Sequence, residues 1–268
     1  MYRTRFAPSP TGYLHLGHAF SVLTAYEAAQ ANAGEFILRI EDIDHTRSRP
    51  QYETAIYEDL VWLGIDWKTP VLRQSDHLPD YQVTLERLRE MGLLYADTRT
   101  RKGEAEAALS APQGEDNHDT APANPAWRLS LETARKYLGP RYDALTFTEK
   151  GAPQKTDPSV NGDVILGRKD IGVAYHLAVV IDDARQGISH IIRGHDLYDA
   201  THTQVLLQAL LGLPTPQYSH HPLLLDAEGR RLAKRKGSKS LRDYREEGLR
   251  AADIKAMLSA TPKGRKPA

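Results

Sequence analysis

The chain has 268 residues, of which 40% are apolar and 26% are charged, and this size allows a substantial core in one large or two modest domains. Basic and acidic residues number 35 each, so a nucleic-acid surface would need local clustering of charge. The absence of cysteine excludes disulfides and thiolate metal sites. No segment has the ~20 apolar residues that cross a bilayer, and no signal-peptide pattern begins the chain. We therefore expect a cytoplasmic protein without membrane association.

The first elements in chain order predict an α/β fold. Residues 2–7 are typical of a short buried strand, and an amphipathic helix is expected over about residues 17–32. A second strand is expected at 35–40. Strand, loop, helix and strand in this order form a βαβ unit, which implies a parallel sheet. Helical patterns follow at about 51–63 and 78–92.

The middle of the chain, residues 96–160, differs in character and is interpreted as an α+β subdomain inserted into the sheet. Residues 110–125 contain Pro, Gly, Asp, Asn and Ala with almost no large apolar side chains, which predicts a surface loop. A short strand signal follows at Trp127-Arg128-Leu129.

The sheet pattern resumes after this insertion. Residues 175–183, which contain a continuous apolar run, and residues 188–193 are both predicted as buried strands. A helix is expected over about 201–211. Residues 229–239 form a strongly basic loop, and a short helical region is expected after it.

The loop at residues 8–18 joins the first strand to the first helix. An open parallel sheet binds ligands at such a place, beyond the carboxyl ends of its strands. Free N–H groups at a helix N-terminus attract phosphates, and His15 and His18 add donors there. Gly12 and Gly17 allow backbone and ligand to approach closely. The alternative interpretation is a turn with two surface histidines.

The sequence of residues 5–18, Arg-Phe-Ala-Pro-Ser-Pro-Thr-Gly-Tyr-Leu-His-Leu-Gly-His, resembles the His-Ile-Gly-His signature in the form that glutamyl-tRNA synthetases carry. That family belongs to the class I aminoacyl-tRNA synthetases and has a Rossmann-type catalytic domain. The resemblance implies that His15 and His18, with Gly17 between them, bind ATP, and that the two histidines stabilise the transition state at the α-phosphate. It also implies ATP with Mg²⁺ as the cofactor. Such chemistry needs positioning and charge stabilisation more than a covalent nucleophile.

The segment at 39–47 begins Arg-Ile-Glu-Asp-Ile-Asp and resembles the family's Arg-x-Glu-Asp-Thr-Asp, with Ile43 in the Thr position. The resemblance implies that Glu41 binds the amino-acid substrate, while Asp42 and Asp44 have structural roles. A single acidic residue in such a place is otherwise typical of a helix-capping turn.

Tyr175 and Arg193 lie near the ends of predicted strands. A planar guanidinium binds a carboxylate through two parallel hydrogen bonds, although a single arginine at a strand edge is usually a solvated charge. The sequence at 175–183 resembles the family's Tyr-x-x-Ala-Val-Val-Val-Asp-Asp segment, and the sequence at 191–194 resembles its Val-Ile-Arg-Gly segment. The resemblance implies a glutamate pocket formed by Arg5, Phe6, Ala7, Pro8, Ser9, Glu41, Tyr175 and Arg193. Which arginine binds which substrate carboxylate stays open.

The basic loop at 229–239 occupies the place of the family's Lys-Met-Ser-Lys-Ser loop. Lys234 matches the catalytic lysine that contacts the ATP phosphates, and Arg231 replaces a lysine of the ATP site. Ala233 replaces the usual serine, so one hydroxyl contact is missing. A basic run is otherwise solvated or binds nucleic acid.

The family often carries a zinc site just after the position of Tyr95. Here Asp97 and Arg99 stand where the first two cysteines would be, and the only histidine nearby is His118. Structural zinc needs about four nitrogen or sulfur ligands, so we predict that the zinc site is lost.

The resemblance divides the chain into the two halves of the catalytic domain, at 1–95 and 161–228, the insertion at 96–160, and the phosphate-binding loop with a short helical region at 229–268. No anticodon-binding domain of the glutamyl-tRNA synthetases is expected. The chain therefore resembles their short paralogues, the glutamyl-Q tRNA(Asp) synthetases. This resemblance implies a monomer that activates L-glutamate without tRNA and transfers it to queuosine in the anticodon stem-loop of tRNA(Asp).

Three alternatives stay open. The chain could be a glutamyl-tRNA synthetase that acylates the terminal ribose, a non-catalytic RNA-binding module derived from a synthetase, or a nucleotidyltransferase that adenylates another small acid. The retained phosphate and amino-acid motifs argue against the second alternative. The glutamate-type Tyr and Arg positions argue against the third.

Overall fold

The computed structural model describes residues 1–98, 125–170, 172–225, 239–261 and 263–264. The first βαβ unit comprises β1 (Arg3–Phe6), α1 (Leu16–Ala31) and β2 (Glu35–Ile40). It continues through α2 (Pro50–Trp62) to β3 (Lys68–Arg73), and all three strands pair in parallel in the order β1-β2-β3. The predicted α/β fold with a parallel sheet is thereby confirmed.

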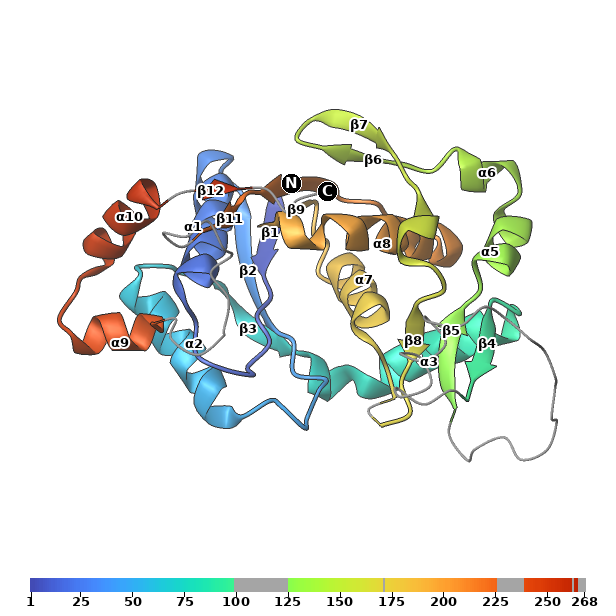
Figure 1. Cartoon of the computed structure of the whole chain (residues 1–268), viewed down its shortest axis with the longest axis horizontal. Coiled ribbons are helices and arrows are strands. Elements are labelled where there is room, and N and C mark those ends of the chain that lie inside the picture. The colour runs from blue at the N-terminus through green and yellow to red at the C-terminus, as the bar shows by residue number, and fades with distance from the viewer. Residues whose placement is uncertain (99–124, 171, 226–238, 262, 265–268) are drawn as a thin grey trace.

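The second half of the sheet lies beside β1. Strands β9 (His190–Gly194) and β10 (Gln217–His221) are parallel and are connected by α8 (Tyr198–Leu211). Ser189 immediately precedes β9 and donates its backbone N–H to the Arg3 carbonyl at 3.0 Å, which links the two halves. Figure 1 shows β1 and β9 side by side near the middle of the molecule.

The prediction of a strand at residues 175–183 is wrong, because Tyr175–Arg185 form the helix α7. A continuous apolar run suits a helix buried on several sides as well as a strand. Helix α7 packs against α8 and against α3 (Leu78–Glu90), so its apolar side chains are covered on more than one face. The helical turn also brings the last acidic residues of the run, Asp182 and Asp183, into the interior.

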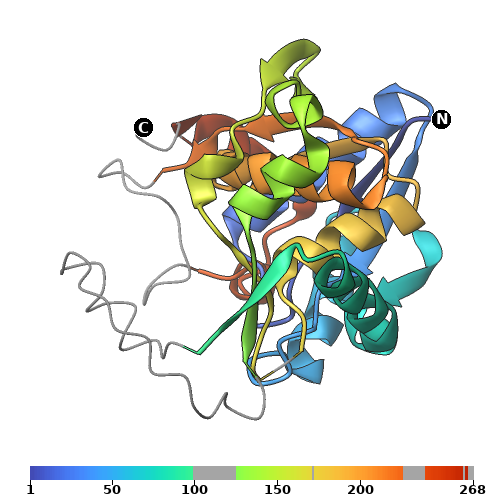
Figure 2. The same ribbon diagram turned by 90° about the vertical axis from the view of Figure 1, so that its right-hand side faces the viewer.

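A smaller antiparallel sheet has the order β4-β5-β8, from β4 (Leu94–Asp97), β5 (Ala126–Leu129) and β8 (Ile165–Gly167). Helices α5 (Leu131–Leu138) and α6 (Pro140–Asp143) lead to the hairpin of β6 (Thr146–Glu149) and β7 (Ala152–Lys155). Strand β6 pairs in parallel with β10, so the hairpin extends the main sheet. Figure 2 shows this hairpin at the top and the teal strand β4 below it, near the middle of the view.

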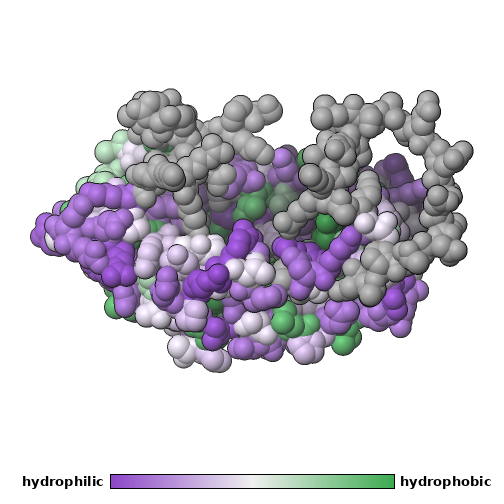
Figure 3. All heavy atoms as spheres, turned by 60° about the horizontal axis from the view of Figure 1, so that its bottom comes forward, coloured by the Kyte–Doolittle hydropathy of each residue, from purple (hydrophilic) through white to green (hydrophobic). Residues whose placement is uncertain are grey.

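Helices α9 (Leu241–Glu246) and α10 (Ala251–Ala260) lie beside α2 and α1, at the left of Figure 1. Strand β11 (Leu223–Leu224) pairs with β12 (Lys263–Gly264). Hydrophilic residues predominate on the face in Figure 3, where hydrophobic residues form small separate patches. Among the described residues, no helix has the length and apolar character needed to cross a membrane.

Candidate active site

A cavity of about 500 Å³ opens at the carboxyl ends of the parallel strands. Its wall includes Phe6 at the end of β1, Glu41 just after β2, Arg193 near the end of β9 and His221 at the end of β10. Loops diverge where parallel strands end, and ligands bind there in open α/β sheets. The cavity therefore lies where the sequence predicted a ligand.

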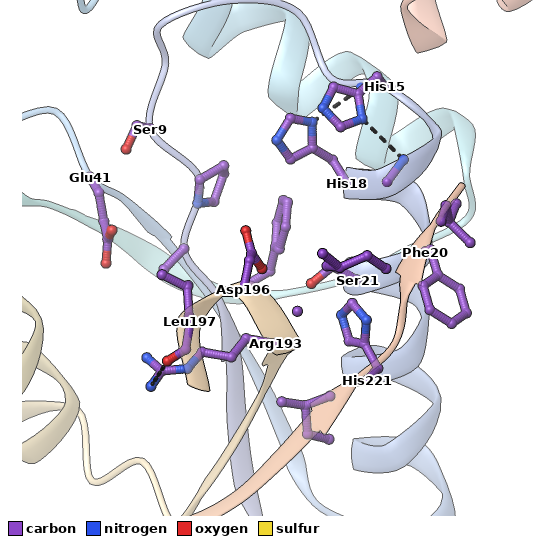
Figure 4. Close-up of a pocket in the computed structure, with 18 of the residues that line it drawn as sticks. Ser9, His15, His18, Phe20, Ser21, Glu41, Arg193, Asp196, Leu197 and His221 are labelled. Atoms are coloured by element: carbon purple, nitrogen blue, oxygen red, sulfur yellow. Dashed lines mark hydrogen bonds between the residues drawn. The ribbon is translucent and has the colours of Figure 1, made fainter. Parts of the chain in front are cut away.

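The structure brings eleven of the predicted site residues to this one cavity. These are Arg5, Phe6, Ala7, Pro8, Ser9, His15, Gly17, His18, Glu41, Tyr175 and Arg193. The two remaining predicted residues, Arg231 and Lys234, lie outside the described residues. In Figure 4, Ser9 and Glu41 lie on one side of the cavity, and His15 and His18 lie at the start of the helix on another.

Both histidines are held at the N-terminus of α1 by the capping of this helix. The Gly17 N–H donates to Nδ1 of His15 at 3.1 Å, and the His15 N–H donates to Nδ1 of His18 at 3.2 Å. The ring centroids are 3.9 Å apart. A Cβ at Gly17 would lie 2.9 Å from the His15 ring, which explains the glycine between them. The two imidazoles lie at the positive end of the helix dipole and form a surface suited to phosphates.

The opposite wall contains a buried charge network. Arg5 donates to both carboxylate oxygens of Asp183, from Nε at 3.0 Å and from Nη2 at 3.3 Å. Arg39 is fully buried and joins Asp183 at 2.8 Å to Glu41 at 3.0 Å. Asp182 accepts hydrogen bonds from Gln74 and Tyr81. This network fixes Arg5 and Glu41 at the cavity wall.

Two opposing effects set the pKa values of the carboxylates in this network: burial raises them, and pairing with arginine lowers them. Burial raises the pKa of Glu41, although Arg39 and Arg5 act against it. Burial also tends to raise the pKa of Asp183, but the nearby Arg5 and Arg39 outweigh it, and that pKa is lowered. The carboxylate of Asp183 is therefore the one that stays ionised most readily, as the partner of two guanidinium groups.

Arg193 is bound differently from the other buried arginines. Its Nε donates to Nε2 of His220 at 3.1 Å, and Nη2 donates to the Leu197 carbonyl at 3.1 Å and the Thr201 hydroxyl at 2.7 Å. Nη1 is buried and has no hydrogen-bond partner among the residues that the structure describes. Burial raises the pKa of Tyr175, whose side chain lines the same cavity. A buried donor without a partner costs free energy, so this wall is suited to an anionic ligand group.

Sequence reasoning missed several residues of the site. No role was predicted for Arg39, Asp182 or Asp183, although all three belong to the quoted motifs. The two aspartates could have been found as two adjacent acidic residues at the end of an apolar run. Asp196 and His221 also line the cavity. Asp196 follows the strand predicted at 188–193, whereas no strand was predicted at β10, which ends at His221.

The region expected to have lost zinc is held by polar contacts. Asp97 is buried and forms an ion pair with Arg128 on the neighbouring strand. The Tyr95 hydroxyl donates to Asp163 at 3.1 Å. Over the part of the chain that the structure describes, no group of three or more His, Asp or Glu residues could hold a metal ion. Arg99 and His118 lie outside that part, so the loss of zinc stays a prediction.

Comparison with known proteins places this site in a family. The model of the catalytic domain of class I tRNA synthetases (E and Q) matches residues 1–121 and 144–260. The glutamyl-Q tRNA(Asp) synthetase of Rhodobacter capsulatus is 45% identical over 95% of this chain and 99% of its own length. The corresponding protein of Symbiobacterium thermophilum is 40% identical over 92% and 81%, respectively.

Longer proteins are also similar to the chain. The glutamate–tRNA ligase of Prochlorococcus marinus is 34% identical over 93% of this chain but only 56% of its own length. The crystal structure of a glutamate tRNA ligase from Elizabethkingia meningosepticum, in complex with its amino acid, matches 92% of this chain and 53% of its own with a TM-score of 0.68 and 28% identity. The chain therefore belongs to the class I tRNA synthetases and, within them, to the ligases of the glutamyl-Q tRNA(Asp) synthetase family.

Proposed function

We propose that this enzyme activates L-glutamate with ATP and transfers the glutamyl group to the queuosine base in the anticodon of tRNA(Asp). The observation that carries the first half of the proposal is the pair of opposed charges in one cavity. Glu41 offers a carboxylate, and Arg193 offers a buried Nη1 without a partner. A zwitterion with an additional acidic group complements such a cavity.

The charges of the network behind the cavity wall support the binding of glutamate. Two guanidinium groups, Arg5 and Arg39, contact three carboxylates, Glu41, Asp182 and Asp183. Glu41 is the carboxylate of this network that lines the cavity, and we assign the substrate ammonium group to it. Arg193 then binds one substrate carboxylate. Arg5 contacts Asp183 through Nε and Nη2, so we assign its Nη1 to the other substrate carboxylate.

Activation joins the α-carboxylate of glutamate to the α-phosphate of ATP. The carboxylate oxygen attacks phosphorus, the bond to the β-phosphate oxygen breaks, and pyrophosphate leaves with the electron pair. We propose that His15 and His18, which the turn at Gly17 holds at the start of α1, stabilise the charge that develops on the α-phosphate, as preorganised donors do. We assign Lys234 and Arg231 to the same phosphates. Mg²⁺, when bound, neutralises phosphate charge.

The acceptor is proposed from the relatives that match this chain along nearly their whole length. Those from Rhodobacter capsulatus and Symbiobacterium thermophilum carry the name glutamyl-Q tRNA(Asp) synthetase. Bases of an anticodon loop can be splayed out and contacted individually, and queuosine supplies hydroxyl groups that can accept an acyl group. The rival acceptor is the terminal ribose, which the likeness to glutamate tRNA ligases favours.

Two experiments test these halves separately. Glutamate-dependent ATP–pyrophosphate exchange should occur with enzyme, Mg²⁺ and ATP alone, and strict dependence on added tRNA would contradict tRNA-independent activation. For the acceptor, tRNA(Asp) with queuosine and tRNA(Asp) with guanine are compared after periodate oxidation of the terminal ribose. Glutamate should label only the queuosine-containing preparation. Equal labelling of both before oxidation, with loss of labelling after it, would identify the ribose as acceptor.

A further inference from the structure

The guanidinium of Arg193 is held only by uncharged acceptors. Its three occupied donor directions lead to Nε2 of His220, the hydroxyl of Thr201 and the carbonyl of Leu197. No carboxylate of the described residues forms an ion pair with it, although its side chain is only 4% exposed. A guanidinium is always charged, so its positive charge is held in position without being neutralised.

The contact with Arg193 determines the tautomer of His220. Arginine has N–H donors and no acceptor, so Nε2 of His220 must accept with its lone pair and carry no proton. The proton of a neutral imidazole then lies on Nδ1, which is 2.8 Å from Oε2 of Glu149. Burial lowers the pKa of His220 to about 4, which outweighs the opposite effect of Glu149. The imidazole is therefore neutral near pH 7.

Glu149 is fixed to the strand that carries this histidine. Its Oε1 accepts the backbone N–H of His220 at 2.9 Å, while Oε2 accepts from the imidazole. Glu149 lies on β6 in the hairpin that extends the main sheet, and His220 lies on β10. The contacts form a chain from a carboxylate through a neutral imidazole to a guanidinium, contributed by three neighbouring strands.

From this chain of contacts we infer that Glu149 and His220 are positioning residues for substrate binding. Glu149 sets the tautomer of His220, and His220 orients Arg193 so that Nη1 points to the substrate carboxylate. The imidazole also separates the two charges. A carboxylate in direct contact would compensate Arg193, as Asp183 compensates Arg5, and would weaken its attraction for an anion. The inference rests on the proposed binding of glutamate.

A purely structural role would predict a different result. If Glu149 and His220 only join β6 to β10, their replacement lowers stability and leaves the affinity for glutamate unchanged. The two roles can be distinguished by comparing the KM for glutamate with the KM for ATP. We assign glutamate to Arg193 and the ATP phosphates to His15 and His18, so a positioning role for His220 should affect the KM for glutamate alone.

The decisive pair of variants is His220→Gln and His220→Leu, assayed by glutamate-dependent ATP–pyrophosphate exchange. Glutamine places an amide oxygen near the position of Nε2 and keeps an acceptor for Arg193, whereas leucine removes it. We expect His220→Leu to raise the KM for glutamate about ten- to hundredfold, as for a lost hydrogen bond to a charged group. The His220→Gln variant should recover most of this loss. The KM for ATP should not change in either variant.

A matched control is His202→Leu. It removes another buried imidazole, which accepts the backbone N–H of Asp157 at 3.0 Å and does not contact Arg193. This variant should lose stability without a change in the KM for glutamate. An equal rise of that KM in His220→Leu and His220→Gln, or no rise in either, would overturn the inference.

A spectroscopic measurement tests the tautomer without any variant of His220. Long-range proton–nitrogen correlation spectra of protein with isotope-labelled histidine identify the protonated ring nitrogen. The wild-type protein should show His220 protonated at Nδ1 alone, and Glu149→Gln should shift the tautomer equilibrium. Protonation of Nε2 in the wild type would overturn the inference. If the wild-type protein showed no glutamate-dependent exchange, the proposed function would be contradicted. The spectra would still test the inferred tautomer of His220 independently.

Discussion

Arg5 and Arg193 line the same cavity and are buried to the same degree, with 5% and 4% exposure, but their partners differ. Arg5 is bound to the carboxylate of Asp183 through two hydrogen bonds. Arg193 is bound to a ring nitrogen, a hydroxyl and a carbonyl, all uncharged. Burial therefore does not by itself show whether the charge of an arginine is compensated. The carboxylate beside Arg5 compensates its charge, whereas the uncharged partners of Arg193 do not.

The largest expected effect comes from removal of the carboxylate on the Arg5 side. Asp183→Asn takes the charged partner from Arg5 and Arg39, and loss of one member of a buried ion pair costs about 3–5 kcal/mol of unfolding free energy. Urea unfolding measures this loss. Because the folded-state pKa of Asp183 is lowered, the wild-type contribution is present at neutral pH and is lost as the pH falls through that pKa.

The control for this variant is Asp80→Asn. Asp80 forms an exposed ion pair with Arg185, and its side chain is 53% exposed. Exposed pairs contribute about 0–1 kcal/mol, so this variant should unfold nearly as the wild type does. Equal destabilisation by the two variants would contradict the distinction between compensated buried charges and surface charges.

The next largest effect is expected on the Arg193 side, in catalysis rather than in stability. Arg193→Ala leaves the substrate carboxylate without its buried partner, which costs about 2–5 kcal/mol in kcat/KM for glutamate. Glutamate-dependent pyrophosphate exchange measures the loss. Arg185→Ala, which removes an exposed guanidinium, is the control. Wild-type efficiency of Arg193→Ala would show that our assignment of the pocket is wrong.

Asp59 sharpens the comparison, because it is a buried carboxylate with only a distant partner. Within the described part of the chain, neither oxygen accepts a hydrogen bond, and Nη1 of Arg245 is 3.7 Å from Oδ1. Burial raises the pKa of Asp59 to about 6. A raised carboxylate pKa destabilises the fold above that pH, and the penalty is relieved as the pH falls toward the unfolded-state value.

Asp59→Asn should therefore stabilise the protein at pH 8 by up to about 3 kcal/mol, and by much less at pH 4. Urea unfolding at both pH values gives the comparison. A loss of stability at pH 8 would show that the ion pair with Arg245 outweighs burial of the carboxylate.

The smallest effect is expected at the predicted site of zinc loss. Arg128→Met removes the partner of the buried Asp97 and should cost about 1–3 kcal/mol. A chelator should leave the Tm of the wild type unchanged, because ion pairing and hydrogen bonds hold this sheet in our prediction. Metal analysis that finds about one zinc per chain would contradict the predicted loss of zinc.

The first βαβ unit could be predicted from sequence because its signals are local. The helix at 16–31 starts at the histidine motif, and the strands around it are short apolar segments bounded by proline and glycine. The helix at residues 175–185 could not be predicted in the same way. Its apolar run is continuous, so its periodicity does not distinguish a helix from a strand, and only packing against α3 and α8 decides it.

The motifs of the sequence, through their resemblance to the family, by themselves predicted eleven residues that meet at the cavity. The residues at the ends of β1, β2 and β9 meet there because the carboxyl ends of parallel strands share one edge of a sheet. The tertiary structure alone decided how the charges are paired. Asp183 lies 178 residues from Arg5 in the chain, and Glu149 lies 71 residues from His220. Coulombic and hydrogen-bonding partners at such separations depend on how the strands and α7 pack, and no local pattern encodes that arrangement.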